Sequence, residues 1–198
     1  MRRLILPALA ILPLLPGPAA AHHPMGGATP STFWHGLLSG LAHPVIGLDH
    51  LAFLLAFGFV AGLAGWGFGL PLLFVGASIL GVASAWAGLA LPGAEMLVAV
   101  SVIAVGGLLL VGRSVPRGAW AALVLLGGIA HGQAFAEAVL GAEATPVGAY
   151  LLGLGIVQAA VMGGVMLLLR QQPRIAAGPL PRVAGLAAAV VGVMALAA

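Results

Sequence analysis

Cysteine and lysine are both absent from this chain of 198 residues, and charged side chains make up only 6% of it. Without cysteine there are no disulfides, thiolate metal sites, iron–sulfur clusters or cysteine nucleophiles. A soluble domain of this length would need about a quarter of its residues charged to solvate its surface. Because 62% of the residues are hydrophobic, we expect the outer surface to face lipid.

The apolar runs favour helices. Lipid offers no hydrogen bonds to the backbone, so only helices or a closed barrel can span it. A barrel needs alternating apolar and polar residues, and the run AALVLL at 121–126 does not alternate. We therefore expect an all-α integral membrane protein that is neither an enzyme nor a nucleic-acid-binding protein. A glycine-rich phosphate loop and room for a soluble ATPase domain are also absent, so this chain alone would not use ATP to drive transport.

The N-terminus resembles a secretory signal. Two arginines at positions 2 and 3 precede an apolar run, and Ala19 to Ala21 satisfies the small-residue cleavage rule. We expect a signal peptide over 1–21, with an uncleaved first helix as the alternative. Cleavage would leave His22 and His23 at a terminus outside the cytoplasm, either as loose metal ligands or as solvated residues.

The remainder divides at its glycines, prolines and arginines. Residues 22–40 are predicted to be an outer segment with a short interfacial helix over 31–40, capped by Ser31 or Thr32. Residues 41–198 are predicted to be a transmembrane domain of six helices, each near the ~20 residues that a bilayer requires. The predicted spans are 41–63, 68–90, 94–112, 117–140, 146–169 and 181–198.

The charges predict the orientation. The five arginines after residue 21 fall in two loops that six crossings place on one side: Arg113, Arg117, Arg170, Arg174 and Arg182. The positive-inside rule then gives a multi-pass protein of a bacterial inner membrane with a periplasmic N-terminus. Every acid and every histidine falls in the outer half, as in a protein that gathers cations from outside. Topology signalling combined with chance is the plainer alternative.

Two groups of ionisable residues lie inside the predicted membrane. His43, Asp49 and His50 belong to the first span, and His131 and Glu137 to the fourth. An intramembrane charge is costly and points to function, and imidazole with carboxylate suits a divalent transition metal. His50 and His131 would each lie about 13 Å below the outer end of their helices, so they could meet if those helices are neighbours. We predict a metal site made of these five residues.

The backbone around His43 is expected to be irregular. In a regular helix His43 and His50 would share a face but lie about 10 Å apart, too far to chelate one ion. Pro44 favours a helix start with His43 as the cap, and Gly47 permits a break. In the fourth span Gly127, Gly128 and Gly132 would let a neighbouring helix approach closely.

The first and fourth spans also share a short sequence pattern. In each span an Ala-His pair is followed by an acid six positions after the histidine: Asp49 follows His43, and Glu137 follows His131. Such a shared pattern is typical of a 3+3 inverted repeat, with coincidence as the alternative. For Gln133 and Gln158 we favour interhelical hydrogen bonds over ligation. For Met162 and Met166, four residues apart, we favour packing over thioether ligation.

The segment His43-Pro44-Val45-Ile46-Gly47-Leu48-Asp49-His50 resembles the H-P-x-x-G-x-D-H signature of the HupE/UreJ family. The segment His131-Gly132-Gln133-Ala134-Phe135-Ala136-Glu137 is similar to the family's second signature, with Ala136 where glycine is common. The resemblance covers the whole chain. It implies a nickel or cobalt permease that serves hydrogenase or urease maturation by secondary transport or facilitated diffusion. It also implies His43, Asp49, His50, His131 and Glu137 as the residues that matter.

Three functions are compared. The leading hypothesis is a permease for Ni²⁺, with Co²⁺ next, in which protons compete with the metal for the imidazoles. Its expected partners are the ion, the bilayer and, in a homo-oligomer, a second copy of the chain. The runner-up is a b-type haem anchor with His50 and His131 as axial ligands. An intramembrane metallohydrolase would want a His-Glu-x-x-His helix, which the sequence lacks.

Overall fold

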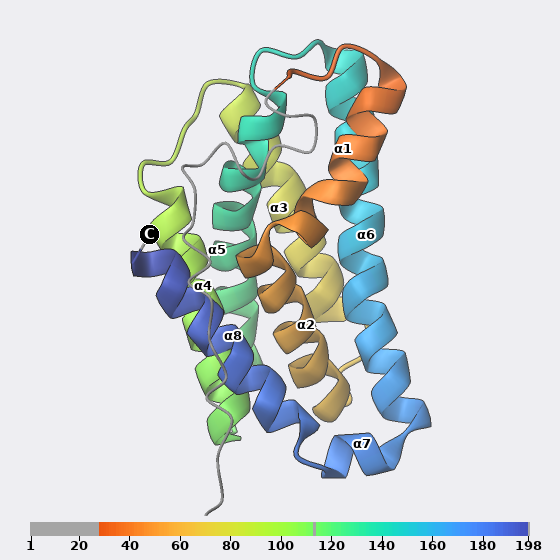
Figure 1. The fold of residues 1–198 in the computed structure, drawn as a ribbon, viewed down its shortest axis with the longest axis vertical. Helices are drawn as coiled ribbons and strands as arrows, with labels where there is room; N and C mark the ends of the chain where they lie inside the picture. Colours follow the sequence, from red (N-terminus) through yellow and green to blue (C-terminus); the bar gives the residue numbers. More distant parts are fainter. Residues whose placement is uncertain (1–27, 113, 198) are drawn as a thin grey trace, which may run out of the picture.

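The structure is a computed structural model of the chain, and it describes residues 28–112 and 114–197. The predicted signal peptide over 1–21, together with His22, His23 and Arg113, lies outside the described residues. Within the described ranges the chain is helical and contains no strands. The helices form one elongated bundle, with a short helix across one end (Figure 1). Their bounds are α1 Phe33–Ile46, α2 Leu48–Leu63, α3 Gly69–Trp86, α4 Ala94–Val111, α5 Arg117–Phe135, the 3₁₀ helix η2 Ala136–Val139, α6 Ala144–Gln171, α7 Pro173–Ala177 and α8 Leu180–Ala197.

Five of these segments are long and apolar enough to cross a membrane: α3, α4, α5 with η2, α6 and α8. The helices α1 and α2 form a sixth if they are counted together, but they bend by 74° at their junction. The prediction of a multi-pass helical membrane protein is therefore confirmed. The predicted start of the first span at residue 41 is wrong, because the helix begins at Phe33, whereas the break that Gly47 was expected to permit is present.

The short helix predicted over 31–40 also differs from the first helix of the structure. Its N-cap is Thr32, whose hydroxyl accepts the N–H of His35 at 3.1 Å, as the sequence indicated. The helix does not end at 40, however, and Pro44 lies within its last turn instead of starting a new helix. Gly36 and Gly40 face the backbone of α6, where a Cβ atom would collide. This close packing holds the chain helical beyond the point at which local preference alone would end it.

Three pairs of helices pack closely: α1 with α6, α3 with α5, and α4 with α8. Figure 1 shows α1 and α6 along one edge of the bundle, and α4 and α8 along the other. Small residues line these contacts, for example Gly106 of α4, where a Cβ would lie 2.5 Å from the nitrogen of Ala189. Lipid gives no hydrophobic drive between helices, so dispersion at short range carries much of this association. The helix α2 packs between the edges, on α4, α6 and α8.

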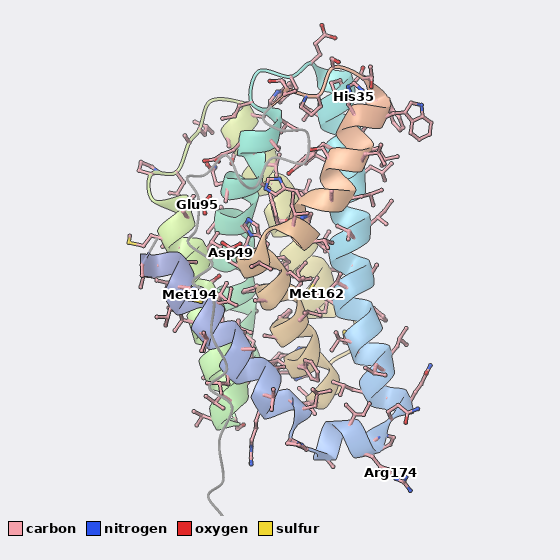
Figure 2. The ribbon with its side chains drawn as sticks, in the orientation of Figure 1. His35, Asp49, Glu95, Met162, Arg174 and Met194 are labelled. Atoms are coloured by element: carbon pink, nitrogen blue, oxygen red, sulfur yellow. The ribbon has the colours of Figure 1, made fainter. Side chains whose placement is uncertain are left out.

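The two ends of the bundle differ in charge. The arginines of the described ranges lie at the end where α5 begins, α6 ends and α8 begins: Arg117, Arg170, Arg174 and Arg182. His35 and Glu143 lie at the opposite end, at the starts of α1 and α6. Figure 2 shows His35 and Arg174 at the two extremes of the molecule. The structure thus has the segregation of arginines that the positive-inside argument used.

Candidate functional site

Three buried histidines from three helices pack against one another. His43 lies near the end of α1, His50 in the first turn of α2 and His131 in the later part of α5. Each side chain is at most 4% exposed. The ring centroids are 5.9 Å apart for His43 and His50, and 4.9 Å apart for His50 and His131. The prediction that His50 and His131 meet inside the bundle is therefore confirmed.

The contact of α1 with α6 places His43. Gly40 lies against the backbone of Tyr150, so the next turn of α1 brings His43 against the side chain of this tyrosine. The His43 Nδ1 atom lies 2.8 Å from the Tyr150 hydroxyl, and this hydroxyl donates to the Phe135 carbonyl at 2.8 Å. A phenol has one hydrogen, so the hydroxyl accepts its second bond from the His43 Nδ1–H group. In neutral His43 the lone pair is therefore on Nε2.

The break at Gly47 places His50. The helix α2 starts at the next residue, and the imidazole folds back over the break. A Cβ atom at Gly47 would lie 2.6 Å from His50 Cδ2, so the ring occupies the space that a side chain would need. The backbone angle φ of Gly47 is −74°, which any residue can adopt. The need for glycine here is therefore one of space and not of conformation.

A second chain of hydrogen bonds orients His131 and His50. The Ser101 hydroxyl on α4 donates to the Val98 carbonyl at 2.7 Å and lies 3.0 Å from His131 Nε2. Since the hydroxyl has one hydrogen, it accepts from the His131 Nε2–H group. His131 Nδ1 must then be an acceptor, and His50 Nδ1–H donates to it at 2.8 Å. Both nitrogens of His131 thus bond within the protein, and the lone pair of His50 is on Nε2.

Phenylalanine rings enclose the imidazoles. The ring of Phe135 lies 4.1 Å from that of His50 and 5.1 Å from that of His43, measured between centroids. The rings of Phe53 and Phe74 lie 4.6 Å and 5.5 Å from His131. Such a shell keeps water away and lowers the local dielectric constant, which strengthens each polar interaction inside it.

The two predicted acids are placed differently from the imidazoles. Asp49 is half-buried in the first turn of α2, where its carboxylate accepts the N–H of His50 at 2.8 Å and faces the positive end of the helix. Glu137 is exposed in η2, and the structure does not bring it to the histidines. Within residues 28–112 and 114–197, no three histidine, aspartate or glutamate side chains form a group arranged to hold a metal ion.

Tyr150, Ser101 and Phe135 belong to the site, although the sequence reasoning did not select them. Two of them carried a signal. Tyr150 is the only tyrosine of the chain. Ser101 is the only hydroxyl residue in the predicted span 94–112. Each is one of the few polar groups in an apolar helix, and such a group needs a partner. Phe135 had no such signal, because an aromatic residue in an apolar helix is usually a packing residue.

The glycines of α5 allow a neighbouring helix to approach closely, as the sequence predicted. For Gly128 and Gly132 this neighbour is α3. A Cβ at Gly128 would lie 2.7 Å from Ala77, and one at Gly132 would collide with the Ser78 carbonyl. Gln133, beside this contact, donates to Ser84 and Leu89 and accepts from Leu91 at 2.8–2.9 Å. The prediction of an interhelical hydrogen bond is confirmed for Gln133.

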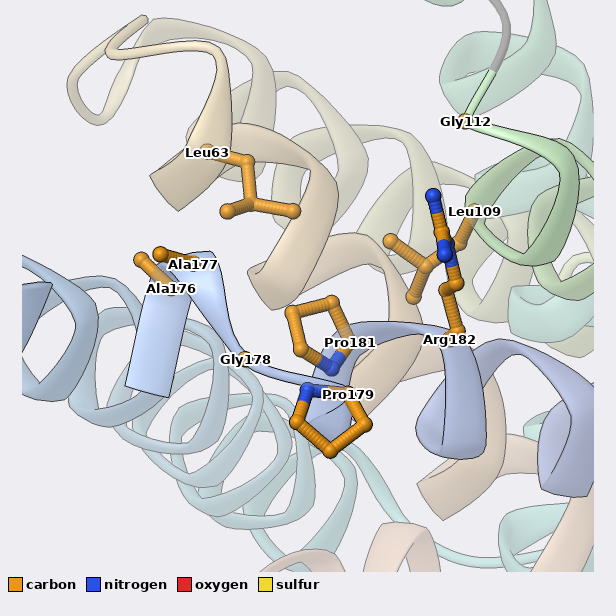
Figure 3. A pocket seen from close by; sticks show the side chains of 9 residues that line it. All are labelled: Leu63, Leu109, Gly112, Ala176, Ala177, Gly178, Pro179, Pro181 and Arg182. Atoms are coloured by element: carbon orange, nitrogen blue, oxygen red, sulfur yellow. The ribbon is translucent and has the colours of Figure 1, made fainter. Parts of the chain in front are cut away.

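A surface hollow of about 400 Å³ lies at the other end of the bundle, between the ends of α2 and α4 and the start of α8 (Figure 3). Among the described residues that line it, Arg182 is the only charged one. A cation would be repelled from it, so this hollow is distinct from the candidate site. Its lining is Leu63, Leu109, Gly112, Ala176, Ala177, Gly178, Pro179, Pro181 and Arg182.

The comparisons with known proteins identify a family for this chain. A family model described as HupE / UreJ protein matches residues 9–195, nearly the whole chain. The search of curated proteins and the search of solved structures each gave no match. The match includes the bent helix pair, the helix that carries His131 and the remaining spans. The chain therefore belongs to the HupE/UreJ family.

Proposed function

We propose that this protein is a secondary permease that moves a divalent transition metal, Ni²⁺ first and Co²⁺ second, inward across a bacterial inner membrane. Membership of a family associated with nickel and cobalt transport for hydrogenase and urease supports this proposal. The observation that carries it is the set of three imidazoles, from α1, α2 and α5, that meet in the interior of the bundle. Imidazole is a good ligand for both ions.

The hydrogen bonds support different roles for the three histidines. His43 and His50 are the ligands, through Nε2, because each donates its Nδ1–H to a protein acceptor. This is the usual arrangement of a metal-ligating histidine, whose other nitrogen is held by a neighbouring group. His131 acts as the acceptor that orients His50, and its own nitrogens are both engaged. Asp49 contributes the negative charge nearest to the pair.

Glu137 attracts cations at the outer end of the bundle. It is exposed at the end of the bundle that also carries Glu143 and His35. Carboxylates gathered at one entrance raise the local concentration of cations and speed their capture. The role of Glu137 is therefore attraction, and ligation falls to residues deeper in the bundle.

Competition by protons is the simplest way to release the bound metal ion from the imidazoles. A metal ion and a proton compete for the same Nε2 lone pair, so acidification displaces the metal. The imidazoles of His43 and His50 lie in a dry shell, where an uncompensated second positive charge is costly. Entry of protons would therefore push the cation onward, and a proton gradient could drive its accumulation.

The packing of the helices supports a 3+3 inverted repeat. In such a repeat the first three spans (α1 with α2, α3 and α4) correspond to the last three (α5, α6 and α8). The contact of α3 with α5 then corresponds to the contact of α6 with α1 and α2. In the same way, the contact of α4 with α5 corresponds to the contact of α8 with α2, and the pair α4 and α8 corresponds to itself. The packing of α2 on α4 has no counterpart of similar extent between α5 and α8. The histidines lie between the two halves, where such transporters bind their substrates.

The alternative of a b-type haem anchor fits the residues poorly. The Nδ1 atoms of His50 and His131 lie 2.8 Å apart and share a hydrogen bond. An iron between two axial histidines, with a porphyrin around it, would need these rings well separated. The space on each side is filled by Phe53 and Phe135.

Uptake of radiolabelled nickel into proteoliposomes tests the proposal. The purified full chain should transport Ni²⁺ and Co²⁺, and His43→Ala and His50→Ala should each lower the initial rate at least tenfold. His35→Ala is the matched control, because His35 is exposed near the start of α1 and lies outside the three-histidine group. Uptake at the normal rate by both alanine variants, or no uptake by the intact protein, would refute it.

A further inference from the structure

The hollow at the arginine-bearing end of the bundle combines apolar walls with a cationic side chain. It lies where the last turns of α2 and α4 meet α7, the turn after α7 and the start of α8 (Figure 3). Leu63 is the last residue of α2, and Leu109 lies near the end of α4. Figure 3 shows the side chain of Arg182 beside Leu109. The volume of about 400 Å³ is within the range of about 300–1,000 Å³ that small-molecule sites occupy.

Two prolines limit how far the hollow can collapse. Pro179 directly precedes α8, and Pro181 is the second residue of this helix. Each ring holds φ near −65° and removes a backbone N–H, so this stretch is stiff and has few donors that need partners. Gly178, with a φ of −84° and a ψ of −171°, is an extended residue between α7 and the first proline. The hollow is therefore bounded on this side by a constrained turn.

The same end carries positive charge that no carboxylate side chain of the sequence offsets. Arg182 is exposed, and the three other arginines of the described ranges lie at this end too. The four acidic residues lie at the bend between α1 and α2 or towards the opposite end: Asp49, Glu95, Glu137 and Glu143. A guanidinium is always charged and can donate two parallel hydrogen bonds to a phosphate. The charge of the hollow therefore complements an anion.

The hollow lies at the level where the membrane-spanning helices end. The helices α4 and α8 are each long and apolar enough to cross a bilayer, and the hollow adjoins the end of one and the start of the other. The border between hydrocarbon and headgroups is therefore close to it. A soluble anion would use Arg182 alone. A phospholipid would also cover the apolar walls, which include Leu63 with 44% of its surface exposed.

We propose that the hollow binds one anionic phospholipid of the adjacent leaflet, with its phosphodiester on Arg182 and its first acyl carbons on the apolar walls. Basic pockets between membrane helices bind lipid headgroups in this way. The ends of α2 and α4 carry partial negative charge and the start of α8 partial positive charge, which favours the phosphate on the α8 side. One arginine matches the one phosphodiester of phosphatidylglycerol. This lipid site is independent of the proposed transport of metal.

A lipid in this position would join elements of both halves of the bundle. The helices α2 and α4 belong to the first three spans and carry His50 and Ser101, while α8 is the last span. A ligand that binds only the folded protein stabilises it. We therefore expect phosphatidylglycerol to raise the midpoint of thermal unfolding.

Native mass spectrometry of the full chain in detergent tests the site. The protein is titrated with phosphatidylglycerol and, separately, with phosphatidylcholine of the same acyl chains, whose headgroup has no net charge. We expect one phosphatidylglycerol to bind about fivefold more tightly than phosphatidylcholine, and Arg182→Gln to remove this preference. Arg174→Gln is the matched control, because Arg174 is exposed on α7 at the same end but does not line the hollow. Equal affinities for the two lipids, or an equal loss in both variants, would overturn the proposal.

The apolar wall offers a second variant, which distinguishes a lipid from a free anion. Leu63→Gln keeps the charge of Arg182 but places an amide where the acyl chain would lie, so it should weaken the binding of phosphatidylglycerol. Leu186→Gln is the control, because Leu186 is exposed on α8 outside the hollow. Inorganic phosphate in large excess should not displace the lipid. Displacement by phosphate, or unchanged lipid binding in Leu63→Gln, would indicate a site for free anions and refute the assignment to a lipid.

Thermal unfolding separates a lost lipid from a damaged fold. Arg182 has no carboxylate partner, so Arg182→Gln should unfold in lipid-free detergent at the same temperature as the unaltered chain. Phosphatidylglycerol should raise the midpoint of the unaltered chain and of Arg174→Gln, but not that of Arg182→Gln. An equal rise in all three proteins would count against the site. So would a lower midpoint of Arg182→Gln without lipid, because Arg182 would then act within the protein.

Discussion

The Nδ1 atoms of His50 and His131 lie 2.8 Å apart, and the proton between them comes from His50. This direction follows from Ser101, which uses its one hydrogen on the Val98 carbonyl and so must accept from His131. A hydroxyl on α4 thereby fixes which nitrogen of a histidine on α2 has a lone pair.

His131→Gln separates a positioning role from a ligand role. Removal of a group that holds a metal-ligating histidine typically costs 10- to 100-fold in metal affinity. We expect a loss of about this size in nickel binding, with the number of imidazole nitrogens on the bound metal unchanged in X-ray absorption spectra. A decrease in that number would show that His131 is itself a ligand. Ser101→Ala should act in the same direction and more weakly.

Tyr150→Phe should disturb His43 from a distance. It leaves the His43 Nδ1–H group without its acceptor and the Phe135 carbonyl without its donor. Each unsatisfied buried group costs about 1–3 kcal/mol. We expect a lower midpoint of thermal unfolding in detergent and weaker nickel binding. The ¹⁵N shifts of His43 should report a change of tautomer. Ser39→Ala is the control: it removes a different buried hydroxyl group, on α1, and should leave those shifts unchanged.

Gly47→Ala should displace the His50 ring. The new methyl group would lie 2.6 Å from His50 Cδ2, which is closer than carbon atoms can approach. We expect a loss of nickel affinity of tenfold or more, measured by equilibrium dialysis, in a protein that still folds. Gly76→Ala on α3 is the control, because a Cβ there meets nothing within 4 Å. That change should be neutral or stabilise the helix by about 0.5–1 kcal/mol. Equal nickel affinity in the two variants would contradict the packing argument.

Glu137→Gln should weaken capture without removing a ligand. An exposed charge acts through a screened interaction of at most about 1 kcal/mol, which corresponds to a fivefold effect or less. We expect the KM of nickel uptake to rise by about two- to fivefold at low salt, with the difference vanishing at high salt. Glu143→Gln should behave alike, since it is also exposed at this end. A large loss that salt does not change would assign Glu137 to the metal itself.

Much of the fold could be predicted because lipid allows few alternatives. The predicted spans 94–112 and 181–198 match α4 and α8 to within a residue at each end, since glycine, proline and arginine mark where the apolar runs stop. The path of the first helix could not be predicted in the same way. Pro44 locally favours a helix start, but the contact of Gly36 and Gly40 with α6 overrides this preference. That contact joins residues more than a hundred positions apart.

The candidate site was partly predictable for a related reason. A charge or an imidazole in an apolar helix is conspicuous, so His43, His50 and His131 could be selected from sequence alone. The division into ligands and a positioning residue that we propose for them depends on single hydrogens of Tyr150 and Ser101, which no spacing reveals.

The bend at Gly47 also shapes the electrostatics of the backbone. The last carbonyl groups of α1 and the first amide groups of α2 have no partners in their own helices, and both sets meet beside the imidazoles. The partial negative charge at the end of α1 attracts a cation, while the side chain of Asp49 offsets the partial positive charge at the start of α2. The carbonyl dipoles of α1 and the Asp49 carboxylate together therefore supply a cation-attracting field that does not depend on the imidazoles, and a protein without these imidazoles should still transport metal at a low rate.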